Sequence, residues 1–417
     1  MAFLARQNRV VVTGVGILAA NGIGKSLFWK TLLASQSGIG LITLFDSSNT
    51  PCKIAGEIKN FDAAKYIDRH MKPNRMGRFT QLALVATQMA IEDAGYDLET
   101  LRPIQNLPLV LGVSTSAVDI LENHVRQIEK RGADNGIPYS TYAFMPHAAV
   151  STITTCLGLN TYPVTISTAC AAGLDAVSMA YSMIRSGRAD VAIAGGADAP
   201  ITRTGFTSFA AAGLVSTRDL DPSRASRPFD LDRDSGVISE GSGVVILENL
   251  THALSRGVDP YLEVTGYGMN TDAHADLPGC GLDETMRMAL ANAGRRPEDV
   301  DYICAHGPGH PVLDRIETEM IKKTLGKRAY DIPVSSIKGV TGNPLAAAGP
   351  MQLVTCALAF QNGIVPPTAN CEKSDPDCDL DYVTGKPRKA HLECAMINSH
   401  GLGGRNCSLV VQRVITA

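Results

Sequence analysis

The sequence of 417 residues is 45% hydrophobic and 19% charged, so it can bury a large core and supply roughly two to three domain-sized units. Its formal net charge of -3 argues against a general affinity for nucleic acids or anionic membranes. The ten cysteines include no C-x-x-C pair, which predicts reduced thiols and no metal site. The sequence has no span of about 18 apolar residues, and its N-terminal apolar run is too short for a signal peptide. We therefore predict a cytoplasmic protein.

Apolar, strand-like runs and glycine-capped helices occur in the same order in both halves of the sequence. In the first half these segments are 12–16, 89–95, 109–112, 163–167, 191–196 and 244–248. In the second half they are 264–268, 288–294, 302–305, 333–337, 394–398 and 409–412. Because all the matches keep one order, we interpret them as an internal repeat.

Strands that are apolar throughout and alternate with helices are typical of mainly parallel sheets with helices on both faces. We therefore predict an α/β fold with two similar halves, residues 1–255 and 256–417, related by a pseudo-two-fold axis. Corresponding strand-to-helix turns should meet near such an axis. The turn at Cys170 is thus expected to face the turn at Asn343.

Cys170 lies where the run 163–167 passes into a helix, in the segment STACAAG. Unpaired backbone N–H groups at a helix N-terminus stabilise a thiolate and can bind an oxyanion. A buried, inert thiol is the ordinary interpretation of a lone cysteine, and we adopt it for the other cysteines. The small neighbours of Cys170 leave room for a substrate, which favours a nucleophile.

His306 follows the strand-like run 302–305 and precedes a helix that carries Asp314 and Glu317. The repeat places His306 at a strand end near the axis, where it could donate a hydrogen bond to a thioester carbonyl or move a proton. Lys338 lies in the small-residue turn of the same half. A buried lysine needs a carboxylate, and we predict that Glu317 pairs with it.

Four motifs carry a resemblance to a known family. They are T-A-C-A-A-G at 168–173, R-P-F-D at 227–230, A-H-G with D-x-x-E at 305–317, and S-x-K-x-x-x-G-N at 336–343. With these motifs the chain resembles the β-ketoacyl-[acyl-carrier-protein] synthases of type II fatty acid and polyketide systems, over essentially its whole length. Members of this family are acyltransferases.

The resemblance implies an α/β fold of the thiolase type, in which two αβαβαββ halves form a five-layered αβαβα sandwich. It implies a homodimer, or a heterodimer with a homologous subunit, that needs no metal or organic cofactor. An acyl carrier protein would deliver an acyl group to Cys170, and decarboxylative Claisen condensation with malonyl-carrier would follow. The motifs assign Cys170 as nucleophile, His306 as the first catalytic histidine, and Lys338 with Glu317 as a structural pair.

The family carries a second histidine where this chain has Asn343. Ketosynthases that resemble the initiating and chalcone-forming enzymes use Cys-His-Asn instead. The NH₂ group of Asn343 could donate to a malonyl thioester oxygen and support the enolate, although it cannot titrate. We therefore expect Asn343 to act in condensation, and the alternative is a packing role in an altered site.

Further departures from the family pattern surround the same cleft. Pro308 and His310 replace two hydroxyl residues expected to hold the pantetheine arm, and Leu402 replaces a gating phenylalanine close to His400. We expect these four residues to contact the substrate of a specialised secondary-pathway enzyme. We also expect the backbone N–H groups of Cys170 and Leu402 to form the oxyanion hole.

Other functions fit the sequence less well or stay open. The turn Gly14-x-Gly16 is typical of dinucleotide binding, but no acidic strand-end residue follows about 20 positions later. A thiolase would need a second cysteine in the C-terminal glycine turn, and Cys394 lies too far upstream. A partner subunit resembling a chain-length factor would typically lack Cys170. An acyltransferase or malonyl decarboxylase with the same Cys and His stays open.

A short segment concentrates basic residues with few acidic ones between them, at Lys65, Arg69, Lys72, Arg75 and Arg78. Such a run is ordinarily a solvated helix face. On a slightly acidic protein it could also steer an acidic carrier protein towards the pocket. We therefore predict Lys65, Arg69 and Lys72 as carrier-binding residues.

Overall fold

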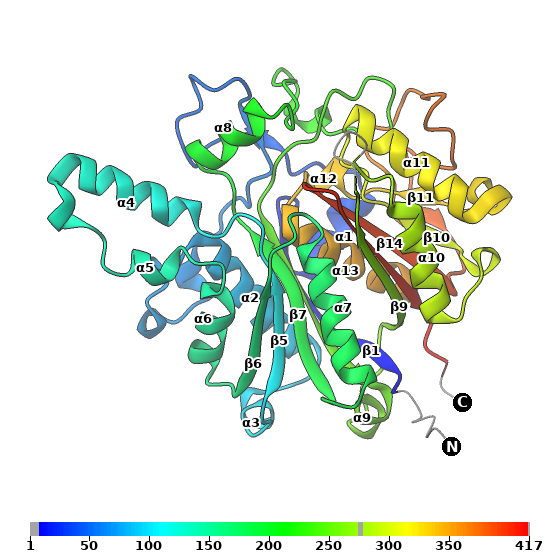
Figure 1. Cartoon of the computed structure of the whole chain (residues 1–417), viewed down its shortest axis with the longest axis horizontal. Helices are drawn as coiled ribbons and strands as arrows, with labels where there is room; N and C mark the ends of the chain where they lie inside the picture. The colour runs from blue at the N-terminus through cyan, green and yellow to red at the C-terminus, as the bar shows by residue number, and fades with distance from the viewer. Residues whose placement is uncertain (1–7, 274–277, 416–417) are drawn as a thin grey trace.

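A computed structural model describes residues 8–273 and 278–415 of the chain (Figure 1). Residues 1–7, part of the segment considered above as a signal peptide, lie outside this range. The strands of the main sheet are β1 Val10–Ala19, β2 Gly22–Ile23, β5 Leu107–Gly112, β6 Thr161–Ile166, β7 Val191–Asp198, β8 Gly241–Asn249, β9 Leu262–Thr271, β10 Tyr302–Cys304, β11 Val334–Ser335, β14 Cys394–Gly401 and β15 Arg405–Gln412. The longer helices are α2 Arg78–Asp93, α4 Val118–Arg131, α6 Ala148–Leu157, α7 Ala172–Arg185, α10 Leu282–Ala293, α11 Pro311–Leu325 and α13 Ala348–Asn362.

Shorter elements fill the connections between these strands and helices. The short helices are α1 Lys25–Leu33, α3 Leu98–Leu101, α5 Ser140–Ala143, α8 Arg203–Ala211, α9 Leu250–Ser255 and α12 Lys338–Thr341. The 3-10 turns are η1 Ala63–Lys65, η2 Arg69–Met71, η3 Pro73–Arg75, η4 Ala133–Asn135, η5 Pro222–Arg224, η6 Pro297–Asp299, η7 Gly326–Tyr330 and η8 Leu345–Ala347. Two small ladders pair β3 Gly40–Leu41 with β4 Ile54–Ala55 and β12 Ile364–Val365 with β13 Arg388–Lys389.

The order of the elements repeats along the chain, as the sequence predicts. The series β1-α2-β5-α6-β6-α7-β7-β8 is followed by β9-α10-β10-α11-β11-α13-β14-β15. The helices α2 and α10 end beside Gly95 and Gly294, whose left-handed backbone (φ 70° and 62°) is the conformation that terminates a helix. The second series begins after α9, and a domain boundary at residue 255 stays a prediction.

The strands form one mixed sheet in the order β11-β10-β14-β15-β9-β1-β8-β7-β5-β6, with β2 beside β1. Parallel pairs join β5 to β6 and β7, and β10 to β11 and β14, whereas the remaining pairs of this sheet are antiparallel. The prediction of mainly parallel sheets is therefore wrong. Helices cover both faces of the antiparallel strands as well, so those strands are as apolar as parallel ones.

Two helices form a central layer between the two halves of the sheet. α7 and α13 pack against each other there, with strands of both halves around them. α2 and α6 cover the outer face of the first half, and α10 and α11 cover that of the second (Figure 1). This arrangement is the five-layered sandwich of the thiolase-type fold. Between the two halves of the sheet, β1 and β9 pair over three residues, from Val10↔Val264 to Val12↔Leu262.

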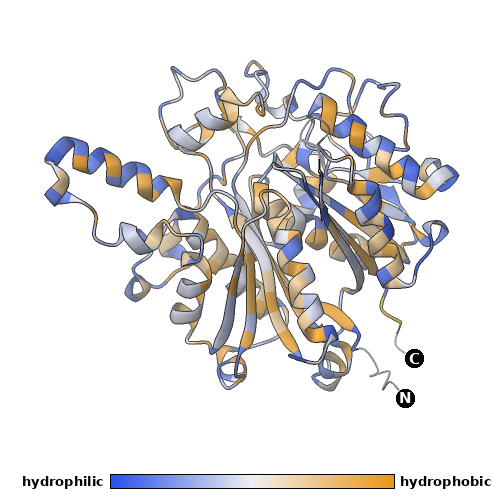
Figure 2. Cartoon of the chain, viewed as in Figure 1, coloured by the Kyte–Doolittle hydropathy of each residue, from blue (hydrophilic) through white to orange (hydrophobic). Residues whose placement is uncertain are grey.

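An arm made of α4 and α5 extends away from the first half of the fold (Figure 1). Figure 2 shows that hydrophilic and hydrophobic residues alternate along α4. Leu121 and Val125 on this helix are exposed. Within the described residues, no helix combines the length and the apolar character needed to cross a bilayer.

Candidate active site

Cys170 lies in a tight turn between β6 and α7. The preceding residue, Ala169, has a left-handed backbone with φ of 54°. α7 begins at Ala172, so Cys170 stands just before the unpaired N–H groups of this helix. The Cys170 side chain is 6% exposed. Burial raises the pKa of its thiol to about 11, against the lowering effects of the Lys338 charge and an Asn343 hydrogen bond.

The two corresponding turns of the repeat meet, as expected from the sequence. A Cβ atom on Gly173 would lie 2.1 Å from the carbonyl oxygen of Ala346, so the approach needs a glycine. Asn343 and Cys170 line the same cavity, and Asn343 lowers the pKa of the Cys170 thiol. The prediction that the turn at 170 faces the turn at 343 is therefore confirmed.

Lys338 holds His306 and fixes its tautomer. The Nζ atom of Lys338 lies 3.0 Å from His306 Nδ1 and also donates to the His306 carbonyl oxygen. An ammonium group only donates hydrogen bonds, so Nδ1 accepts and the ring proton is on Nε2. Burial, Lys338 and His400 lower the pKa of His306 well below its ordinary value. His306 is thus neutral at pH 7 and offers an N–H donor.

Lys338 and Glu317 do not form the direct ion pair that we predicted. The Glu317 carboxylate accepts from the backbone N–H groups of His306 at 2.9 Å and Gly307 at 2.8 Å. The backbone of His306 thus binds both groups, since its N–H faces the carboxylate and its carbonyl faces the ammonium. Both charges obtain partners without direct contact. Burial lowers the pKa of Lys338 to about 8 and raises that of Glu317.

The R-P-F-D segment supports the loop that follows His306. Phe229 has a left-handed backbone (φ 62°) and stacks on Tyr382 with ring centres 4.0 Å apart. Its N–H donates to one carboxylate oxygen of buried Asp314 at 2.8 Å, and the N–H of Gly309 donates to the other at 3.1 Å. Asp314 therefore ties this segment to the His306 loop.

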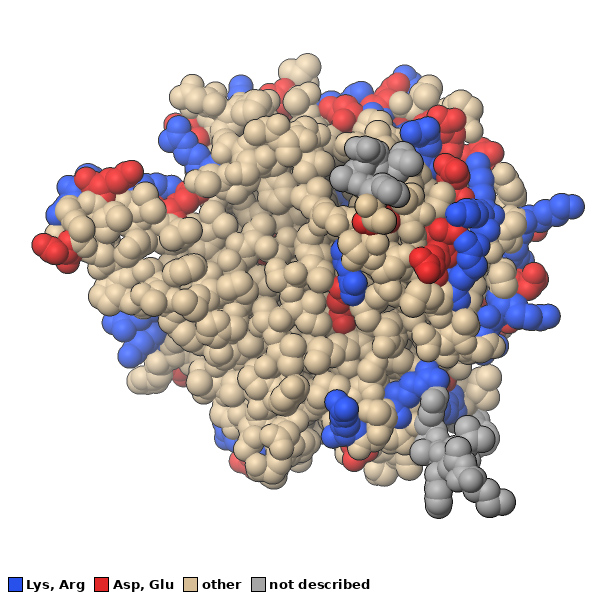
Figure 3. Space-filling view, viewed as in Figure 1, with Lys and Arg blue, Asp and Glu red and all other residues tan. Residues whose placement is uncertain are grey.

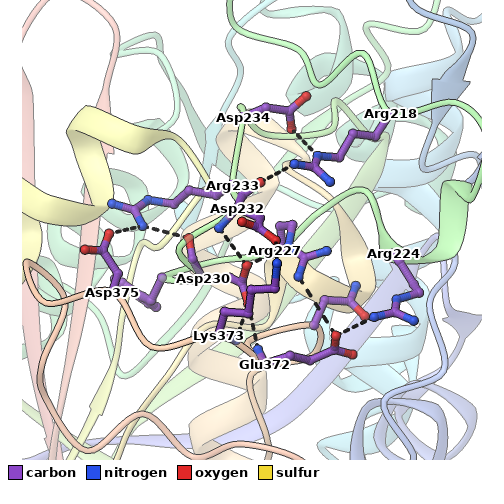
Figure 4. A network of polar contacts seen from close by, with 12 residues as sticks. Arg218, Arg224, Arg227, Asp230, Asp232, Arg233, Asp234, Glu372, Lys373 and Asp375 are labelled. Atoms are coloured by element: carbon purple, nitrogen blue, oxygen red, sulfur yellow. Dashed lines mark hydrogen bonds and ion pairs between the residues drawn. The ribbon is translucent and has the colours of Figure 1, made fainter.

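Ion pairs fasten the same segment to the loop 372–375 (Figure 4). Arg227 Nε donates to Asp230 at 2.9 Å, and Asp230 also accepts from the backbone N–H groups of residues 372 and 373 at 2.7 and 2.8 Å. Arg233 pairs with Asp375. The motif thus has a supporting role, because these contacts keep the wall of the site in place.

A cavity of about 470 Å³ adjoins Cys170 and collects the predicted site residues. Cys170, His306 and Asn343 line it together. So do all four residues that we expected to contact substrate, Pro308, His310, His400 and Leu402. Lys338 and Glu317 stay behind His306 in the buried interior, at 1% and 4% exposure.

Asn343 reaches the cavity from a rigid turn. Its N–H donates to the carbonyl of Val237 at 2.7 Å, and its carbonyl accepts from the N–H of Ser239 at 3.0 Å. Gly342 before it has a left-handed backbone (φ 70°). In the described structure the Oδ1 atom of Asn343 is buried without a protein partner. The amide therefore has hydrogen-bonding capacity left for a ligand.

Two of the predicted substrate contacts have further features. His310 Nδ1 accepts from the N–H groups of Val312 at 3.2 Å and Leu313 at 3.4 Å, so it caps α11 and leaves only its other ring nitrogen for a ligand. Leu402 lies in the turn between β14 and β15, and it is 52% exposed. A hydrogen bond from its N–H to an oxyanion stays a prediction.

Sequence reasoning missed Asp198, which joins the loop after β5 to the turn that follows Asn343. This fully buried carboxylate at the end of β7 accepts from the N–H groups of Thr115 at 2.8 Å and Ala346 at 2.9 Å. Burial raises its pKa to about 6. The sequence does show a carboxylate at the end of an apolar strand, in the segment AGGAD, and this position could have identified Asp198.

The basic segment is not a helix face. Lys65, Arg69 and Lys72 lie in or beside the successive turns η1, η2 and η3, and all three are exposed. Asp62 and Asp68 cap the first two turns with their side chains. Arg78 of the same run is half-buried and pairs with Glu240, so it is not part of the exposed group.

The fold and this cavity define a thiolase-type enzyme with a cysteine, a histidine and an asparagine in its site. Comparison with known proteins narrows the class. Residues 7–253 match the family described as "Beta-ketoacyl synthase, N-terminal domain", and residues 261–372 match "Beta-ketoacyl synthase, C-terminal domain". The chain therefore belongs to the β-ketoacyl synthase family, and relatives named 3-oxoacyl-[acyl-carrier-protein] synthase 2 are condensing acyltransferases.

Relatives come from both fatty acid and polyketide biosynthesis. The chain is 39% identical to the 3-oxoacyl-[acyl-carrier-protein] synthase 2 of Synechocystis sp., over 98% of each chain. It is 36% identical to the tetracenomycin polyketide synthase ketoacyl synthase alpha subunit of Streptomyces glaucescens, over 98% of this chain and 97% of the relative. Among solved structures, the ishigamide ketosynthase/chain length factor superimposes with a TM-score of 0.91 at 32% identity, covering 98% of this chain and 100% of that one.

Proposed function

We propose that this protein is a β-ketoacyl synthase that loads an acyl group onto Cys170 and condenses it with a malonyl group, in a specialised fatty acid or polyketide pathway. The observation that carries the proposal is the convergence of three groups on one cavity. They are a cysteine at a helix N-terminus, the N–H donor of His306 and the amide of Asn343. The relatives named above support the same reaction class.

In the first step, the sulfur of Cys170 attacks the carbonyl carbon of an acyl thioester. A new C–S bond forms, the carrier's sulfur leaves, and the proton of the Cys170 thiol passes to that leaving sulfur. The backbone N–H groups of Cys170 and Leu402 hold the oxyanion that forms on the way. One thioester is thus exchanged for another.

In the second step, the Nε2–H of His306 and the NH₂ group of Asn343 donate to the thioester oxygen of malonyl-carrier. These donors stabilise the enolate that remains when the bond to the carboxylate breaks and CO₂ leaves. The enolate carbon then attacks the acyl group on Cys170 and releases the Cys170 thiolate, which takes up a proton. Neither donor has to titrate, so an amide can replace an imidazole at position 343.

The intact mass of the protein tests the proposal. The protein is first exposed to acyl-carrier protein, and malonyl-carrier protein is added afterwards. We expect an acyl adduct on Cys170 that is discharged as a β-ketoacyl product. An adduct that persists or moves unchanged to another acceptor would indicate an acyltransferase, and acetyl-carrier without product would indicate a malonyl decarboxylase. Absence of any adduct would indicate a non-condensing partner subunit.

Carrier-protein binding at the exposed basic segment is part of this proposal. One similar solved structure is a complex of a type II polyketide acyl-carrier protein with its ketosynthase. The matched chain of that complex superimposes with a TM-score of 0.90 at 32% identity, covering 98% of this chain and 100% of that one. Charge reversal of Arg69 and Lys72 to Glu should raise the KM for acyl-carrier about tenfold at low salt and less at high salt. The same reversal at exposed Lys386 and Lys389 serves as the control. Unchanged turnover in the first variant would contradict the assignment.

The free edge of the main sheet at β6 suits pairing with a second copy of the chain or with a homologous subunit. β6 ends the strand order and carries exposed Tyr162. The face around it is almost free of charged side chains in its central part (Figure 3). Sedimentation velocity should give a dimer for the wild type and a monomer for a variant with Tyr162→Asp on this sheet edge. A monomeric wild type would indicate a separate homologous partner.

The ten free cysteines support a reducing compartment for this enzyme. A cytoplasmic location stays a prediction.

A further inference from the structure

Hydrogen bonds fix the orientation of the Asn406 amide beside the cavity. The Nδ2 atom of Asn406 lies 2.7 Å from the carboxylate of Asp272 and 3.2 Å from the carbonyl oxygen of Gly404. Both partners only accept hydrogen bonds, so this end of the amide is the NH₂ group. The other end, Oδ1, is 2.8 Å from His400 Nδ1. His400 therefore donates from Nδ1 and carries a lone pair on Nε2.

The three histidines that line the described part of the cavity thus differ in what they offer. In His306 and His310, Nδ1 accepts from Lys338 and from backbone N–H groups, so their Nε2 atoms carry the proton. In His400, Nδ1 is the donor and Nε2 is the acceptor. The rings of His306 and His400 meet edge to face, with centres 6.1 Å apart. The cavity therefore receives a donor and an acceptor from neighbouring imidazoles.

The hairpin that carries His400 is fastened to the nucleophile turn. Ser399 Oγ donates to the carbonyl oxygen of Cys170 at 3.1 Å. A Cβ atom on Gly401 would lie 3.2 Å from the Cys170 nitrogen. Both neighbours of His400 in the sequence thus contact the turn, and His400 lines the same cavity as Cys170.

Acyl transfer needs a proton acceptor in this cavity. The buried thiol of Cys170 keeps its proton at neutral pH, because burial raises its pKa to about 11. His306 faces the cavity as a donor, and an amide such as Asn343 is not a base. Burial lowers the pKa of His400, so its ring is neutral and free to accept at pH 7.

Resting on the function proposed above, we propose that His400 is the general base of acyl transfer. Its Nε2 takes the proton of the Cys170 thiol, directly or through one water molecule, as the Cys170 sulfur bonds to the acyl carbon. It then returns this proton to the carrier's sulfur as that C–S bond breaks. The negative charge of Asp272 stabilises the transient imidazolium through the Asn406 amide, which bonds to both groups.

The charged and titratable groups around His400 set the sign of its pH dependence. Asp272 follows β9 and raises the pKa of His400. Lys338 of α12 lowers it, as does burial, which is the largest effect. His306 faces the ring from the loop after β10, and Cys170 lies across the cavity. The base is therefore competent at neutral pH and is lost by protonation as the pH falls below the ordinary histidine pKa of about 6.5.

Single-turnover acylation of the wild type over pH 5–10 is the first test, followed by intact mass. With His400 as base, the rate should be nearly constant from pH 7 to 9 and should fall in acid. A rate that climbs about tenfold per pH unit through this range would show that the thiol ionises unaided, and would overturn the proposal. A wild type that forms no adduct at all would instead contradict the proposed function.

The substitution His400→Asn is the second test, because asparagine keeps a donor for Asn406 and removes the Nε2 lone pair. We expect acylation to slow by about 100-fold at pH 7 and to approach the wild-type rate as the pH rises. Decarboxylation of malonyl-carrier should stay within about threefold of the wild type, since the proposed donors for that step, His306 and Asn343, remain. Equal loss of both activities would mean a purely structural residue, and unchanged acylation would exclude the base.

Discussion

The two corresponding strand-to-helix turns of this protein share a position but not a composition. In the first half, residues 167–171 connect β6 to α7 and carry one reactive side chain, Cys170, among small neighbours. In the second half, the longer connection 336–347 between β11 and α13 contains α12 and η8. That connection supplies Lys338 and Asn343. The repeat thus provides two facing positions, and the extra length of one provides the polar groups.

This difference separates the two parts of the proposed reaction. The first turn binds the acyl group, whereas the second turn and the His306 loop act on the malonyl thioester. If this division is correct, substitutions in the two turns should affect different steps.

The largest effect is expected from Cys170→Ala, which removes the nucleophile of the first turn. Intact mass after exposure to acyl-carrier should show no adduct, while circular dichroism and the melting temperature should stay close to the wild type, because the site is small and the change removes one sulfur atom. An adduct that forms on this variant would contradict the assignment of Cys170.

A smaller effect is expected from His306→Ala, which removes a donor of the second half. Decarboxylation of malonyl-carrier should fall by about 10²–10³-fold. Acylation of Cys170 should fall much less, since that step uses other groups. CO₂ release and single-turnover acylation are the two measurements, and equal loss in both would abolish the division between the turns.

The contact between the turns can be tested at Gly173. Although alanine favours helices, Gly173→Ala should destabilise the protein by about 1–3 kcal/mol, because the new methyl group would meet the Ala346 carbonyl. Chemical denaturation measures this free energy of unfolding. Gly40→Ala is the matched control, as no atom lies within 4 Å of a Cβ there. A neutral Gly173→Ala would show that the turns can separate without cost.

The smallest effect is expected from Asn343→His, which makes the second turn titratable. The condensation rate at pH 7 should change only a few-fold, but its pH profile should gain an inflection below the ordinary histidine pKa of about 6.5, because burial lowers the pKa of the other histidines in this cavity. Condensation measured between pH 5 and 9 would show it. An unaltered profile would favour a packing role for Asn343.

The repeat made much of the fold predictable from the sequence. Apolar runs between glycine-capped helices correspond to strands such as β5, β7, β10 and β14. Strand direction was not predictable in this way. A buried strand such as β8 has the same apolar character in either direction, because helices cover both of its faces.

Site residues that lie at the end of a strand could be predicted from the sequence. Site residues whose role depends on partners far away in the sequence could not. Cys170 and His306 follow strand ends, so their sequence positions already suggested a shared cleft. The partner of Glu317 was mistaken, because backbone N–H groups that satisfy a carboxylate leave no mark in the sequence. Asn406 and His400 face each other across the β14–β15 hairpin, which also required the three-dimensional register.

The central position of α13 has a consequence for how the protein unfolds. This helix belongs to the second series of elements, yet its residues from Ala348 to Phe360 are buried and it packs on strands of both series. The sheet itself joins the halves over only three residue pairs in β1 and β9. Detaching one half would therefore strip α13 of part of its apolar surroundings, at about 25 cal/mol for each Å² exposed. Neither half has a complete hydrophobic core without the other. We therefore expect the chain to unfold in a single cooperative transition.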